Sequence, residues 1–99
     1  MKSLQKERKL PLTEHVKFLA RLQTQNRIQI PVEIRQRFKL EAKQFLRVQI
    51  RHIDSFHDET FFAKMKPDGR ITVPWEITWT LEIKPGHMLR VMLYPEEQE

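Results

Sequence analysis

The sequence of 99 residues contains no cysteine and only two glycines, Gly69 and Gly86. The lack of cysteine excludes disulfide bonds, thiolate catalysis and zinc sites built on thiolates. With two isolated glycines there is no glycine-rich loop of the kind that cradles phosphates in nucleotide-binding enzymes. No apolar run approaches the roughly 20 residues that span a bilayer, and residues 1–9 lack the apolar stretch of a signal peptide. We therefore expect a cytoplasmic protein that is not an enzyme, holds no cofactor and does not enter membranes.

Acidic charge is also scarce in the first half of the chain. The net charge is +5, with a pI near 9.8. Residues 1–15 carry +2, residues 16–58 carry +5 and residues 59–99 carry −2. A basic balance favours polyanions as partners. The pattern predicts a basic N-terminal extension (1–15), one domain (16–95) and an acidic tail (96–99).

The domain contains an internal repeat. A shift of 43 positions aligns residues 16–51 with residues 59–94 without a gap, and ten of the aligned pairs are identical. The string Arg-Ile-x-Ile/Val-Pro-x-Glu-Ile recurs intact, which chance similarity between two β-patterned stretches does not explain. We therefore interpret the chain as a duplication, with repeat one at 16–58 and repeat two at 59–95.

Each repeat has the pattern strand, hairpin, strand, short helix, strand. Phe18, Ala20 and Leu22 alternate with polar residues, as in a half-buried strand. Turn residues follow at matching positions, Gln25-Asn26 and Asp68-Gly69, and Asp-Gly favours a tight hairpin. A proline then ends the second strand and fits the first turn of a helix. In the last strand of repeat one, apolar residues at 46, 48 and 50 alternate with polar residues at 47, 49 and 51.

Two such β-β-α-β repeats give a mainly β protein with two short helices. Three strands in each repeat present too few apolar faces for two separate cores. The repeats must therefore share one interior, and the predicted architecture is a six-stranded barrel with pseudo-twofold symmetry, whose closure also removes exposed strand edges.

The recurring segments resemble a known family. Asn26-Arg-Ile-Gln-Ile-Pro-Val-Glu-Ile-Arg35 and Gly69-Arg-Ile-Thr-Val-Pro-Trp-Glu-Ile-Thr78 look like the signature of the AbrB/SpoVT-type transcription regulators, to which MraZ-like proteins are related. Those proteins are swapped-hairpin DNA-binding proteins that normally dimerise, each chain giving half a barrel. The resemblance covers about 36 residues in each repeat and implies a DNA-binding function.

One departure affects the expected connectivity. Family members usually carry a fourth strand after the third, whereas here residues 53–58 turn directly into the first strand of repeat two. The sequence is thereby also similar to RIFT barrels and double-psi barrels of the same cradle-loop group. A RIFT-type barrel is preferred, with the swapped-hairpin and double-psi forms as alternatives.

The resemblance places DNA contacts at arginines of the first hairpin and of the short helix. By position these are Arg27 and Arg70 in the hairpins and Arg35 in the first helix, where repeat two has Thr78. Guanidinium groups on outer strand faces contact phosphates, which supplies affinity and register without sequence recognition. The predicted DNA-binding residues are Lys17, Arg21, Arg27, Arg35, Arg37, Arg47, Arg51 and Arg70, with Lys39 as a further candidate. Solvated surface charge is the alternative for each, and the recurrence of Arg47 as Arg90 fits a structural role.

Trp75 and Trp79 stand one helical turn apart, where they form either a protein-interaction face or a packing surface for the N-terminal segment 4–15. Packing is the favoured interpretation. His52, Asp54, His57 and Asp58 form a weak candidate metal cluster, but polar residues are common in turns, and no metal site is predicted.

These observations together favour a DNA-binding transcription regulator that contacts phosphates through the basic face of repeat one. A protein-interaction or antitoxin-like module, with a protein partner or homodimer through Trp75 and Trp79, is the main alternative. A nucleotide- or flavin-handling enzyme of the RIFT type is a further one.

Overall fold

The computed structural model describes residues 15–94, so that most of the predicted N-terminal extension and the whole acidic tail lie outside the described residues. The described chain is mainly β, with six strands in two sheets and two short α-helices. The strands are β2 (Val16–Arg21), β3 (Arg27–Gln29), β4 (Phe45–His52), β5 (Glu59–Lys64), β6 (Arg70–Thr72) and β7 (Met88–Leu93). A 3-10 turn, η1 (Thr24–Asn26), precedes β3.

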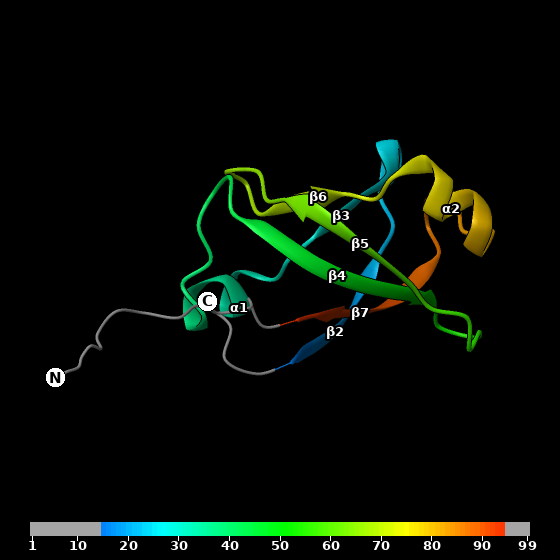
Figure 1. Ribbon diagram of the computed structural model, residues 1–99, viewed down its shortest axis with the longest axis horizontal. Coiled ribbons are helices and arrows are strands. Elements are labelled where there is room, and N and C mark those ends of the chain that lie inside the picture. The colour runs from blue at the N-terminus through cyan, green and yellow to red at the C-terminus, as the bar shows by residue number, and fades with distance from the viewer. Residues whose placement is uncertain (1–14, 95–99) are drawn as a thin grey trace, which may run out of the picture.

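The two helices begin where the sequence predicts. Helix α1 (Val32–Arg37) follows Pro31, and helix α2 (Trp75–Leu81) follows Pro74. Proline has a fixed φ and no N–H to donate, so it ends a strand and suits the start of a helix. The helices lie at opposite ends of the molecule (Figure 1). Among residues 15–94 there is no helix that is long and apolar enough to cross a membrane.

All strand ladders join the segment 16–58 to the segment 59–94. The larger sheet is antiparallel with the order β2-β7-β4-β5, and β3 pairs with β6 in a separate two-stranded ribbon (Figure 1). Neither segment forms a sheet by itself. The expectation that the two halves share one interior agrees with this pairing.

The predicted hairpins inside each repeat are wrong. Strand β2 forms its ladder with β7 and not with β3, and the turn between β2 and β3 holds one isolated bridge, between Gln23 and Arg27. In the second half, the Lys66 N–H donates to the Arg70 carbonyl at 2.9 Å, which closes the Asp-Gly turn only locally. The chain therefore changes direction at the two predicted turns. The strands on either side of each turn, however, pair with strands of the other half.

Many backbone hydrogen bonds have an equivalent in which each residue is replaced by the one 43 positions away in the other half. The Leu22 N–H donates to the His87 carbonyl at 2.9 Å, and the Met65 N–H donates to the Gln44 carbonyl at 3.0 Å. Positive φ angles recur in the same way: Asn26 (58°) with Gly69 (86°), Lys39 (55°) with Glu82 (57°), and Lys43 (71°) with Gly86 (99°). The two halves therefore have closely similar backbones.

The core lies between the four-stranded sheet and the β3–β6 ribbon. Val48 and Val91 from the sheet and Ile28 and Ile71 from the ribbon are at most 2% exposed and belong to one apolar cluster. Ile34, Ile77 and Leu81 of the helices pack against it, as their helical spacing predicts. The side chains on the other faces of the sheet and of the ribbon therefore point away from the core in opposite directions.

Candidate nucleic-acid interface

Six cationic side chains occupy the outer face of the four-stranded sheet. In β4 the buried Leu46, Val48 and Ile50 face the core, so that the intervening Arg47 and Arg51 face outward. The same alternation holds in β2, β5 and β7. The outward strand positions carry no acidic residue, and their cations are Lys17, Arg21, Arg47, Arg51, Lys64 and Arg90. We call these six residues the basic face.

Two of these arginines stand directly opposite each other. Arg51 of β4 pairs in register with Arg90 of β7. Like charges opposite each other on one face repel. Asp58 lies near Arg51, with 3.8 Å between Oδ1 and Nε, and both side chains are partly exposed. Such a pair is weak, and within residues 15–94 Arg90 forms no ion pair, so this part of the sheet carries a net positive charge.

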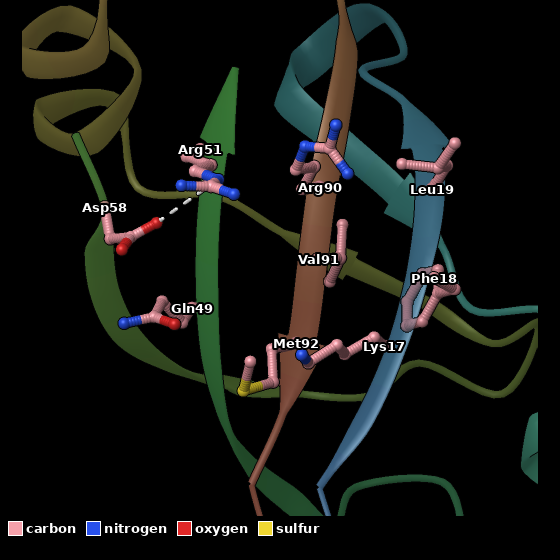
Figure 2. Close-up of a pocket in the computed structure, with 9 residues that line it drawn as sticks. All are labelled: Lys17, Phe18, Leu19, Gln49, Arg51, Asp58, Arg90, Val91 and Met92. Carbon is pink, nitrogen blue, oxygen red and sulfur yellow. Dashed lines mark ion pairs between the residues drawn. The ribbon is translucent and has the colours of Figure 1, made fainter. Parts of the chain in front are cut away.

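A shallow groove of about 460 Å³ lies over this arginine pair. Figure 2 shows Arg51 and Arg90 on neighbouring strands at one end of it and Lys17 and Met92 at the other. Gln49 and Leu19 also line it. The groove therefore combines cations, which suit phosphate, with the Asp58 carboxylate, a neutral amide and apolar groups.

Two other arginines of the basic face are held by contacts with neighbours. The Arg47 guanidinium lies 4.3 Å from the centre of the Tyr94 ring, and the Tyr94 N–H donates to the Arg47 carbonyl at 3.0 Å. Arg21 Nη1 donates to the Gly86 carbonyl at 2.8 Å. Side chains that are already ordered lose less conformational entropy when they bind a ligand.

Apolar side chains flank the cations on the same face. Leu19, Phe45 and Phe62 occupy outward strand positions and are 53%, 60% and 67% exposed. Large exposed apolar groups that gather on one surface are typical of interaction sites.

A second group of arginines lies around the β3–β6 ribbon. Arg27 and Arg70 are on its outer side, because the next residues, Ile28 and Ile71, are buried and successive side chains of a strand point to opposite faces. Arg70 Nη2 lies 2.7 Å from Asp68 Oδ2, and the Arg70 N–H donates to Asp68 Oδ1 at 3.0 Å. The hydrogen bond from the Arg70 side chain, followed by that from its backbone N–H, lowers the pKa of Asp68. Arg70 is therefore engaged with a carboxylate, whereas Arg90 has no such partner among residues 15–94.

Arg35 serves the packing of the fold. Its Nε donates to the Ile30 carbonyl at 3.0 Å, and its guanidinium lies against Gly69, where a Cβ atom would overlap it. Gly69 also has a φ of +86°, a conformation that glycine adopts without penalty. The small residue in the second half thus makes room for the large one in the first half.

The eight predicted DNA-binding residues do not share one surface. Lys17, Arg21, Arg47 and Arg51 lie on the basic face. Arg27 and Arg70 lie on the ribbon, directed away from it. Arg35 and Arg37 belong to α1, where the Arg37 guanidinium lies 5.0 Å from the Phe38 ring centre. Sequence reasoning left out Arg90 and Lys64, although the alternation in β7 and β5 could have identified both as outward-facing.

Trp75 and Trp79 are both well exposed on α2, at 66% and 77%. A shallow surface depression beside them is lined also by Thr78, Ile83 and His87. The N-terminal residues up to 14 that were expected to cover them lie outside the described residues.

The histidines near the β4–β5 turn are directed to separate partners. The Asp54 N–H donates to His52 Nδ1 at 3.0 Å, and His57 Nε2 lies 2.8 Å from Glu59 Oε2. The His52 ring meets the His87 ring edge to face, with 4.9 Å between centres. No three His, Asp or Glu side chains converge as metal ligands anywhere in residues 15–94.

Comparison with known proteins gives one finding about the fold. The chain matches no protein-family model and no curated protein. It is similar to the solution structure of PHS018 from Pyrococcus horikoshii, with 25% identity and a TM-score of 0.72 over 83% of this chain and 95% of that one. The similarity extends over nearly the whole of both structures and concerns their fold.

Proposed function

We propose that this protein binds DNA through the basic face and acts as a transcription regulator of the AbrB-like kind. The observation that carries the proposal is the set of six cations on the outward positions of four neighbouring strands, with no acidic residue among those positions. Neutralisation of phosphates releases condensed counterions, which is the main source of affinity for nucleic acid. The basic face includes Arg90 and Lys64 of repeat two, so that both repeats contribute.

We further propose that the chain is a tandem duplication whose strands close into a pseudo-twofold cradle-loop barrel of the RIFT type. The recurrence of backbone hydrogen bonds and positive φ angles at a spacing of 43 residues supports this origin. The pairing of β4 with β7 supports the symmetry, because Gln49 lies opposite Met92, its own equivalent in the other repeat. Arg47 and Arg90, and likewise Arg27 and Arg70, are then equivalent pairs.

These equivalent pairs allow a test with a matched control. Arg47→Glu/Arg90→Glu reverses two charges on the basic face, and Arg27→Glu/Arg70→Glu makes the same change in net charge on the ribbon. Binding of a fluorescein-labelled DNA duplex of random sequence and about 20 base pairs is measured by anisotropy, between about 50 and 200 mM salt. Circular dichroism melting confirms that each variant is folded.

For the unmodified protein we expect the affinity to fall by about 10²- to 10³-fold over this salt range, as for about five phosphate contacts. The first double variant should lose binding, and the second should lose much less. An affinity that salt does not change, or equal losses in the two variants, would contradict the proposal.

A second candidate function is a protein-interaction module or homodimer formed through α2. The exposure of two tryptophans one helical turn apart favours it, because tryptophan is enriched among residues that dominate interface energies. Sedimentation should then reveal a complex that persists at high salt and dissociates in Trp79→Ala. A protein that is monomeric at all concentrations and salt levels would exclude the homodimer.

A further inference from the structure

We infer that the basic face binds single-stranded DNA more tightly than double-stranded DNA, an inference that rests on the proposed function above. The observation is the interleaving of exposed phenylalanines with cations on one sheet face. Phe62 stands directly opposite Arg47, and Phe45 directly opposite Lys64. Each ring therefore has a cation one strand away on the same surface.

The rings are available to a ligand. Phe62 is 67% exposed, and within residues 15–94 no other ring or cation lies against it. Phe45 is 60% exposed and has Lys64 Nζ 5.0 Å from its ring centre. Nucleobases stack on such rings whatever their sequence, while neighbouring cations hold the backbone phosphates.

The bases of duplex DNA cannot stack on these rings. Four strands spaced by about 4.8 Å span about 14 Å before side chains are added. The major groove is about 12 Å wide and admits one helix or a two-stranded ribbon. The four-stranded face therefore stays outside the groove and meets only the phosphate backbone, which would place Phe45 and Phe62 against charged oxygens. A single strand can instead turn its bases towards the sheet.

The two ends of the basic face differ in a way that provides a control. The position equivalent to Phe62 in the other repeat is Leu19, which is also exposed on the face, at 53%. Phe62→Leu therefore places at one end the residue that the protein already has at the other. It keeps an apolar side chain and removes the aromatic ring.

The experiment measures anisotropy of labelled oligo-dT of about 20 nucleotides and of a duplex of the same length, with the full chain at about 100 mM salt. We expect oligo-dT to bind at least about tenfold more tightly than duplex. Phe62→Leu should weaken oligo-dT binding by about tenfold, the effect of losing one stacked base, and leave duplex binding unchanged. Leu19→Ala should change oligo-dT binding by no more than about threefold.

The outcomes separate the two proposals. If neither DNA binds, the proposed function fails. If duplex binds as tightly as oligo-dT, or if Phe62→Leu binds oligo-dT like the unmodified protein, the single-strand inference is overturned while DNA binding stands. Unchanged melting temperatures for Phe62→Leu and Leu19→Ala ensure that a loss of affinity is not a loss of fold.

Discussion

The contact between Arg35 and Gly69 gives a prediction about stability that tests how the two halves fit together. Gly69→Ala places a methyl group where the Arg35 guanidinium lies and puts a Cβ atom on a residue with a φ of +86°. An L-residue in the left-handed region costs about 1 kcal/mol. Displacement of Arg35 breaks its hydrogen bond to the Ile30 carbonyl, which costs about 1 kcal/mol more. The single substitution should therefore destabilise the protein by about 2 kcal/mol.

A second substitution isolates the steric part. Arg35→Thr installs the residue found at the equivalent position, Thr78, and should cost about 1 kcal/mol because it removes the same hydrogen bond. The double variant should cost about 2 kcal/mol rather than the 3 kcal/mol of the two changes added together, since that bond is lost only once. The expected coupling is therefore about 1 kcal/mol.

Urea unfolding followed by circular dichroism measures all four free energies, and a small domain of this size is expected to unfold in two states. Additivity within about 0.4 kcal/mol would refute the reasoning. It would mean that Arg35 moves aside from the new methyl group without losing a stabilising contact.

Asp68, the two equivalent core leucines and Trp79 each allow a further test. The carboxyl of Asp68 should titrate below its ordinary pKa in an NMR titration, and Arg70→Gln should raise that pKa. Because the folded pKa is lowered, the stabilisation is present above about pH 4 and is lost as the pH falls through the folded pKa; a normal pKa would contradict this. Leu89→Ala and Leu46→Ala should each lower the free energy of unfolding in urea by about 2–5 kcal/mol, because the two side chains are 0% and 3% exposed, and a cost below about 1 kcal/mol in either would be inconsistent with a shared core. Trp79→Ala should change the free energy of unfolding by less than about 0.5 kcal/mol, because Trp79 is 77% exposed; a larger loss would indicate that the ring is covered in solution.

The basic face could be partly predicted from the sequence. The alternation in β4 identified Arg47 and Arg51 as outward-facing, and the structure confirms this. The same period applies to Arg90 in β7, but its recurrence with Arg47 suggested a structural role instead. That Arg51 and Arg90 face each other depends on the register of two strands about 40 residues apart, and no local pattern encodes that register.

Local sequence patterns predict where the strands and helices lie and which side of each strand is buried. Alternating apolar residues and helix-starting prolines are local signals, and a side chain that must leave water does so in any arrangement of the strands. The choice of partner for each strand, in contrast, depends on how the whole chain packs. Backbone N–H and C=O groups are alike in every residue except proline, so β2 could have paired with β3 across the turn between them. Burial of one common core between the halves instead placed β2 beside β7 and β3 beside β6, and that choice directs the ribbon arginines and the sheet arginines to opposite sides.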